Sequence, residues 1–324
     1  MNNLNAILFQ YDMTLEHYER YGKVLKVTTN QGTFALKETR LTRDRMDWML
    51  YLENYFRELK FNGYVPLINT KYGDTFVVVE DRVVYLSHWI EEGSVNPSLK
   101  ESQMIQRLAE LHGYSVKDHA FSEESIKHFY EKMVVLRESR QFEMEKYVND
   151  IEKRIYLSPF ELAVATHFHQ LMKNCDLSKS RLDYWFEQTN ETKRYRTVLC
   201  HGKCSASHFV VGREKGYFLN FEKSVVDSPV RDLTYMIRAS VPPFQFNPDT
   251  LVSNISHYES QFALHEEEKD LLASYLYFPE SLFNSVTHFL SNQRDWSHMK
   301  HVRHFTKKIE VMNGITTTLQ NMRA

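Results

Sequence analysis

The order of secondary-structure patterns along the chain constrains its fold most. A β-rich segment comes first, long amphipathic helices follow, and one β-hairpin interrupts the helices. In the first segment, "KVLKVTT" and "TFALKE" (residues 23–29 and 33–38) are joined by "NQG", which predicts a hairpin. "TFVVVEDRVVYLSHWI" predicts two further strands around a tight turn. A small antiparallel sheet is the simplest assembly of these strands.

One helix is predicted within this β-rich segment. Thr42 can cap a helix over residues 43–62, and Gly63 is suited to end it in the left-handed conformation. Apolar residues recur loosely with a period of 3.6, as an amphipathic helix requires. They are Met46, Met49, Leu50 and Leu52.

Strong capping signals mark the helices that follow. Asn96 and Pro97 occupy N-cap and N1 positions of a helix that Gly113 is expected to end. Ser158 opens a capping box with Glu at its third helical position. Residues 229–324 are expected to be helical throughout. The final helix is expected to bury one apolar stripe, made of Met299, Val302, Phe305 and Ile309.

Composition excludes several classes of protein. The 324 residues are 42% hydrophobic, enough for a sizeable core, and 40 basic against 42 acidic residues give a net charge of −2. Such a balance does not favour nucleic acid or an anionic membrane as partner. No apolar run reaches the roughly 20 residues that span a bilayer. The N-terminus lacks a signal-peptide pattern, and three cysteines make no disulfide framework, so a reducing interior is expected.

The stretch "VLCHGKCSASHFVV" (residues 198–211) concentrates reactive side chains. Cys200, His201, Cys204 and His208 could bind zinc, or Cys204 could be a nucleophile with one histidine as its base. However, Cys200 and His201 are adjacent on a predicted strand and should point to opposite faces. No second Cys/His pair follows at zinc-finger spacing. We therefore expect no metal site here, and the metal and thiol readings remain minor alternatives.

Several motifs, in the right order over nearly the whole chain, resemble those of the aminoglycoside phosphotransferase-like kinases, which include choline, homoserine and methylthioribose kinases. They are "TFALKE", "RLAELHG", "LCHGKCSASHFVV", "YFLNFEKS" and "SPVRDLTYMI". The residues that match the structural part of these motifs are Leu111, His112, His201, Gly202 and Asp232. His201 would then be a structural hydrogen-bonding residue.

This resemblance implies an α+β, protein-kinase-like fold of two lobes. The N-lobe would cover residues 1–92 as a small antiparallel sheet with one helix. The helical C-lobe would cover residues 93–324 and carry a β-hairpin, with the catalytic loop at 198–211 and the metal-loop strand at 217–223. Lys37 would take the place of the lysine that holds nucleotide phosphates, and Glu53 would be its ion-pair partner.

The departures from the family pattern fall on the catalytic positions. Lys203 stands at the base position, His208 at the metal-binding Asn position and Asn220 at the metal-binding Asp position. A lysine is a cation at neutral pH and cannot accept a proton, and loss of a general base typically costs about 10²–10⁴ in rate. Hard Mg²⁺ prefers charged oxygen ligands to imidazole. These replacements indicate a degenerate site with no bound metal.

More narrowly, the chain is similar to the spore coat protein S-like branch of this group, from endospore-forming bacteria. "GTFALKE", "GYVPLI" and "SPVRDL" carry that similarity. It implies a pseudokinase made in the mother-cell cytoplasm and associated with the spore coat. Other coat proteins are the expected partners, with a small molecule or nucleotide as a further ligand and neither nucleic acid nor membrane. No cofactor is expected.

An active enzyme is the alternative to this reading. The chain would then be an ATP- and Mg²⁺-dependent phosphotransferase with an alcohol acceptor and an atypical site. Lys203 would neutralise phosphate charge, and Glu222 or another carboxylate would supply the metal ligand or the base.

Overall fold

The computed structural model describes residues 2–93, 95–120, 123–240, 246–291 and 296–322. The chain divides into two compact units at places that differ from the lobe boundary predicted after residue 92. The sheet unit comprises Met1–Tyr114 and Ala206–Ser224, and the helical unit comprises Ser115–Ser205 and Val225–Ala324. No helix in the described ranges is both long enough and apolar enough to cross a membrane.

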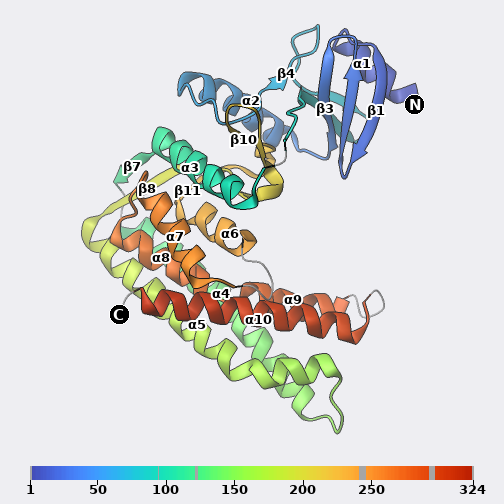
Figure 1. The fold of residues 1–324 in the computed structure, drawn as a ribbon. Helices are drawn as coiled ribbons and strands as arrows, with labels where there is room; N and C mark the ends of the chain where they lie inside the picture. The colour runs from blue at the N-terminus through green and yellow to red at the C-terminus, as the bar shows by residue number, and fades with distance from the viewer. Residues whose placement is uncertain (1, 94, 121–122, 241–245, 292–295, 323–324) are drawn as a thin grey trace. The chain divides into compact units, whose positions relative to one another are not determined.

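An antiparallel sheet forms the centre of the sheet unit (Figure 1). The strand order is β1-β2-β3-β6-β4, and β5 also pairs with β6. The strands are β1 (Leu15–Tyr21), β2 (Val24–Thr29), β3 (Gly32–Thr39), β4 (Leu67–Ile68), β5 (Val77–Val79) and β6 (Arg82–His88). The two predicted hairpins are β2–β3 and β5–β6, so both predictions are confirmed.

Three helices and a second hairpin complete the sheet unit. They are α1 (Asn2–Gln10), α2 (Arg43–Glu58), α3 (Pro97–Ser115), β9 (Phe209–Val211) and β10 (Gly216–Phe218), with short 3₁₀ helices η1 (Ala206–His208) and η2 (Phe221–Lys223). Helix α1, which the sequence analysis did not predict, shares a buried cluster with the strands through Ile7 and Leu8. The β9–β10 hairpin joins the loop after α2, because Phe218 exchanges backbone hydrogen bonds with Gly63 and Val65.

Helix α2 ends earlier than predicted, and Gly63 does not end it. Lys60 takes the left-handed conformation with φ 54° instead. Its amide donates to Arg57 O and the Phe61 amide donates to Phe56 O, which is a Schellman motif. The Phe56 and Phe61 rings lie 5.5 Å apart and supply the apolar contact that accompanies this motif. This contact stabilises the helix end although Lys60, and not a glycine, takes the left-handed conformation.

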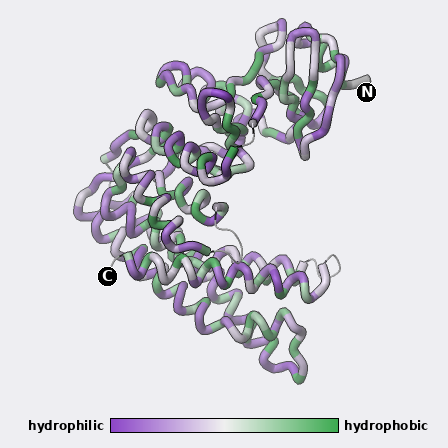
Figure 2. The backbone as a smooth tube through the Cα atoms, in the orientation of Figure 1, coloured by the Kyte–Doolittle hydropathy of each residue, from purple (hydrophilic) through white to green (hydrophobic). Residues whose placement is uncertain are grey.

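The helical unit contains seven described helices in sequence order α4 to α10 and a three-stranded sheet of order β11-β8-β7 (Figure 1). The strands are β7 (Lys117–Ala120), β8 (Arg194–Cys200) and β11 (Val225–Asp227). The helices are α4 (Glu123–Glu152), α5 (Pro159–Thr192), α6 (Val230–Ser240), α7 (Pro248–Glu259), α8 (Glu266–Tyr277), α9 (Glu280–Ser291) and α10 (His298–Asn321). The long helices alternate hydrophobic and hydrophilic residues, as amphipathic helices do (Figure 2).

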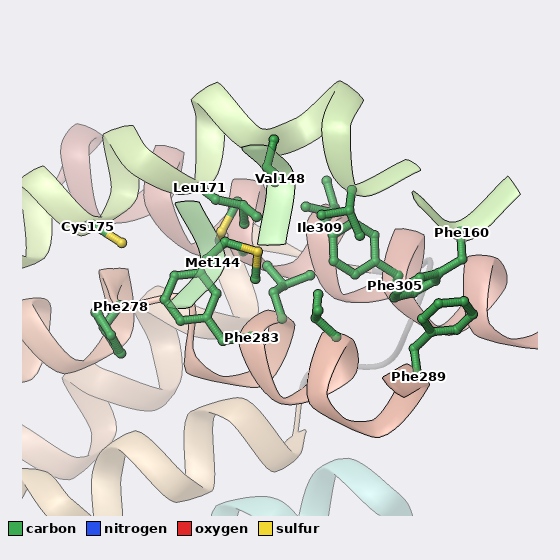
Figure 3. Packing of buried hydrophobic residues seen from close by; sticks show 14 residues of the cluster. Met144, Val148, Phe160, Leu171, Cys175, Phe278, Phe283, Phe289, Phe305 and Ile309 are labelled. Atoms are coloured by element: carbon green, nitrogen blue, oxygen red, sulfur yellow. The ribbon is translucent and has the colours of Figure 1, made fainter. Parts of the chain in front are cut away.

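One core cluster joins α4, α5, α9 and α10 (Figure 3). Met144 and Val148 of α4 meet aromatic residues such as Phe160 and Phe305 there. The predicted capping box at Ser158 is present and starts α5. The predicted stripe of α10 is wrong at Met299, which is 64% exposed, because the buried register of this helix begins at His301 instead.

Candidate functional site

Lys37 lies on β3 opposite Tyr85 of β6, and its side chain forms a mostly buried ion pair with Glu222. Its Nζ atom lies 2.8 Å from Glu222 Oε1 and donates a hydrogen bond of 2.6 Å to Asn220 Oδ1. The side chains of Lys37 and Glu222 are 15% and 12% exposed. Since the pair is largely out of water, the attraction is stronger than on a surface. The ammonium group is therefore already compensated by a carboxylate and an amide oxygen of its own chain.

Asn220 occupies an unusual backbone conformation directly before η2. Its φ and ψ are 69° and 64°, in the left-handed region that asparagine tolerates better than most residues. This conformation turns the chain between β10 and η2 and brings the carboxamide to Lys37. Asn220, which the sequence analysis predicted at the position of a metal-binding carboxylate, offers an amide oxygen to Lys37.

Helix α2 and strand β6 hold the η2 segment in place. Arg45 donates to the carbonyl oxygens of Glu222, Phe221 and Ser224, the last at 2.5 Å. Burial lowers the pKa of Arg45, and the Glu222 charge opposes that shift. The Tyr85 hydroxyl donates to Glu222 Oε1 at 2.8 Å, and burial, followed by the Glu222 charge, raises the pKa of Tyr85 well above its usual value. Glu222 is thus fixed from two sides.

The expected pairing of Lys37 with Glu53 is replaced by the pairing with Glu222. The Glu53 carboxylate instead accepts hydrogen bonds from the Tyr64 hydroxyl at 3.4 Å and the Leu67 amide at 3.3 Å. Burial is the main reason that its pKa is raised. Glu53 therefore ties α2 to the loop that precedes β4.

His208 is the last residue of η1, directly before β9. Its carbonyl accepts a hydrogen bond of 2.8 Å from the Leu219 amide, and its Nδ1 lies 3.1 Å from Ser207 Oγ. The β9–β10 hairpin thus brings His208 close to Asn220, and these are the two residues that the sequence analysis predicted at the metal-binding positions. They offer imidazole nitrogens and an amide oxygen.

In the helical unit, Asp232 orders the loop that carries Lys203. This buried carboxylate, in the first turn of α6, accepts the backbone amides of His201 at 2.5 Å and Gly202 at 2.8 Å. Gly202 has φ 77°, a value that favours glycine. The Lys203 amide donates to His201 Nδ1 at 3.2 Å, while the Lys203 side chain is exposed. The loop is therefore ordered around Asp232, and Lys203, which the sequence analysis predicted at the base position, exposes a cationic side chain to solvent. Leu111 and His112 of α3 have no exposed surface.

The cysteines in this loop are poorly suited to nucleophilic chemistry. Cys200 and Cys204 have no exposed surface, and burial raises the pKa of each thiol well above its usual value. The Cys200 thiol donates to Ser228 O at 3.3 Å. A thiolate, which is the reactive form, is therefore disfavoured at both positions.

A family model described as "Spore coat putative kinase YutH" matches residues 5–322. The chain belongs to this family. The spore-coat branch expected from the sequence motifs is thereby confirmed. Comparison with curated proteins finds no match.

Several solved structures that share this fold are described as phosphotransferases or as members of a kinase family. An aminoglycoside phosphotransferase from Alicyclobacillus acidocaldarius subsp. acidocaldarius DSM 446 has a TM-score of 0.80 and 14% identity over 98% of this chain and 95% of that chain. Spectinomycin phosphotransferase APH(9)-Ia, solved with ADP and spectinomycin, has a TM-score of 0.65 and 14% identity over 98% of both chains. A choline/ethanolamine kinase family protein from Mesorhizobium loti has a TM-score of 0.52 and 10% identity over 99% of both chains. These likenesses confirm the predicted kinase-like fold class.

Sequence analysis missed three contributors to the Lys37 site. Arg45, Trp48 and Tyr85 all act on the η2 segment, Trp48 by donating to Ser224 Oγ at 3.0 Å. The pairing of β3 with β6 places Tyr85 opposite Lys37, and the sequence analysis did not predict which strands of the sheet are neighbours beyond the two hairpins. No local pattern marks Arg45 and Trp48, since their partners lie more than 170 residues away.

Proposed function

We propose that this protein is a pseudokinase of the spore coat, which binds partners or supports coat assembly and does not transfer phosphate. The observation that carries this proposal is the Lys37 ammonium, held between Glu222 and Asn220 of its own chain. In the family pattern this cation serves nucleotide phosphates. Here a nucleotide would have to displace a mostly buried carboxylate before it reached Lys37.

The residues at the metal position do not fit a divalent cation. Structures of similar fold hold ADP, or AMP-PNP with Ca²⁺. In this chain the oxygens nearest that position, Asn220 Oδ1 and Glu222 Oε1, both contact the Lys37 ammonium. A divalent cation between them would meet a fixed positive charge within a few ångströms, which is repulsive in a poorly hydrated site. No catalytic step is therefore assigned to a metal or nucleotide.

The base position supports the same proposal. Lys203 carries a cation on an exposed side chain, where the family pattern has the carboxylate that accepts a proton. Together with the coat family, this favours a role through binding to other coat proteins or to a small ligand. Production in the mother-cell cytoplasm and deposition in the coat belong to this proposal.

Nucleotide binding tests the proposal directly. Thermal unfolding is measured with and without millimolar ATP and Mg²⁺, and phosphate transfer to alcohols is measured in parallel. We expect an unchanged melting temperature, whereas a ligand at 100 times its dissociation constant would add about 2.7 kcal/mol of stability. ATP hydrolysis or phosphorylation that disappears in Lys37→Ala, but persists in the exposed control Lys23→Ala, would contradict the proposal.

An active ATP-dependent phosphotransferase is the second candidate. The observation in its favour is Glu222, a carboxylate two residues after Asn220 that could replace the missing metal ligand if Lys37 moved to a phosphate. This candidate predicts a clear rise in melting temperature with ATP and Mg²⁺ that Glu222→Gln abolishes. An unchanged melting curve in the wild-type protein excludes it.

A further inference from the structure

Helix α4 presents one continuous exposed stripe along almost its whole length. Its members are separated by three, four or seven residues, which places them on one face of an α-helix. They are Glu124, His128, Glu131, Val135, Phe142, Lys146 and Asn149 of α4, together with Lys153 in the turn directly after the helix, and we call this set the α4 stripe. At 1.5 Å per residue, the helical part of the stripe, from Glu124 to Asn149, is about 38 Å long.

The α4 stripe lies opposite the face that enters the core. Met144 and Val148 point into the buried cluster of the helical unit (Figure 3). In contrast, Val135 is 65% exposed and Phe142 is 66% exposed. These two large apolar side chains lie two turns apart near the middle of the 30-residue helix. They expose hydrophobic surface to water, and a second protein surface packed against α4 would bury it. Leu136, which is 57% exposed, widens this apolar centre.

The charges of the α4 stripe are opposite at its two ends. Glu124 and Glu131 lie before the apolar centre, and Lys146 and Lys153 lie after it. The pairs Glu124 with Lys153, Glu131 with Lys146, and Val135 with Phe142 all share one midpoint, between residues 138 and 139. An antiparallel copy of the same helix would therefore place every acidic member opposite a basic one. A parallel copy would place like charges opposite each other.

We propose that the α4 stripe is a homodimer interface, in which α4 of one copy packs antiparallel to α4 of a second copy about a two-fold axis. Such an interface is isologous, so one surface must complement itself. The shared midpoint of the three pairs meets this requirement, which an unrelated partner would not impose. The proposal does not depend on the proposed pseudokinase function.

The side chains near the midpoint are compatible with close approach. Ser139 is small and exposed. Glu138 is already paired with Lys179 of α5 at 3.0 Å, so its charge near the axis is compensated. Within the stripe, Glu131 has an exposed contact of 3.8 Å with Lys127, a kind of pair that contributes little and can be exchanged.

Oligomeric state tests the apolar centre of the interface. Sedimentation velocity of the full chain from low to high micromolar concentration is expected to show a monomer–dimer equilibrium. Phe142→Ser should weaken dimerisation at least tenfold, while Met299→Ser, an equally exposed apolar position on α10, should leave it unchanged. Circular dichroism and thermal unfolding verify that each variant is folded. A wild-type monomer at every concentration overturns the proposal, as does a dimer that Phe142→Ser leaves intact.

Charge exchange tests the antiparallel register. Lys146→Glu with Lys153→Glu should give a monomer, and so should Glu124→Lys with Glu131→Lys, because each protomer then faces like charges. Mixing these two double variants should restore a dimer. The variant that carries all four substitutions, whose amino-acid composition equals that of the wild-type protein, should also form a dimer. Failure of both rescues in folded proteins overturns the proposed register and with it the interface.

Discussion

Substitution of Glu222 by glutamine tests the ion pair at the centre of the site. The change keeps the shape and an acceptor oxygen for Tyr85, but it removes the charge that compensates Lys37. Breaking a buried pair costs about 3–5 kcal/mol, while an exposed pair is worth about 0–1 kcal/mol. With side chains 15% and 12% exposed, and with Asn220 Oδ1 still accepting from Lys37, we expect Glu222→Gln to cost about 2–3 kcal/mol.

Urea unfolding followed by tryptophan fluorescence and circular dichroism measures this loss. The double variant Lys37→Met with Glu222→Gln should lose much less than the sum of the two single variants, because no uncompensated buried charge remains. We expect a coupling of at least about 1.5 kcal/mol in this double-mutant cycle. Trp48 hydrogen-bonds Ser224 beside the pair and gives a local fluorescence signal.

A matched control separates the buried pair from ordinary surface charge. Glu38→Gln removes the partner of Arg82 in the same sheet, where the side chains are 50% and 48% exposed. That change should lie within about 0.5 kcal/mol of the wild-type protein. A Glu222→Gln loss below about 1 kcal/mol, or additive losses in the cycle, would refute the reasoning that Lys37 depends on Glu222.

Further predictions concern the helical unit. Asp232→Asn replaces one of the two acceptor oxygens by an NH₂ group, so the backbone N–H of His201 or of Gly202 loses its acceptor. The substitution should lower the free energy of unfolding in urea by about 2–3 kcal/mol. A loss below about 1 kcal/mol would argue against the role of Asp232 in ordering this loop. Arg137→Met should change stability by no more than about 1 kcal/mol, because the hydroxyls of Ser178 and Ser274 also donate to each other's carbonyl groups; a loss above about 2 kcal/mol would show that the cation itself is needed. Burial raises the pKa of Cys175 to about 12 and raises those of the other two cysteines, so no cysteine of the native protein should react with a thiol reagent at about pH 9, whereas all three should react in urea. Rapid labelling of the native protein would contradict this prediction.

Local patterns predicted much of the fold. The hairpins β2–β3 and β5–β6 and the start of α5 follow from turn residues and a capping box, whose partners lie within a few residues of each other. Local patterns failed where a contact from elsewhere decided the outcome. Helix α2 ends at the Phe56–Phe61 contact instead of at Gly63, and α1 depends on packing against strands that follow it in the chain.

The same division applies to the candidate site. The sequence by itself determined the prediction that Lys203, His208 and Asn220 stand at the catalytic positions of the fold, because motif order assigns these positions without coordinates. Only the tertiary structure decided that Lys37 pairs with Glu222 instead of with Glu53. Lys37 and Glu222 are 185 positions apart in the chain. The left-handed backbone of Asn220 and the hydrogen bonds of Arg45 to the η2 segment bring them together. Long-range ion pairs depend on backbone geometry and burial, which residue order alone does not specify.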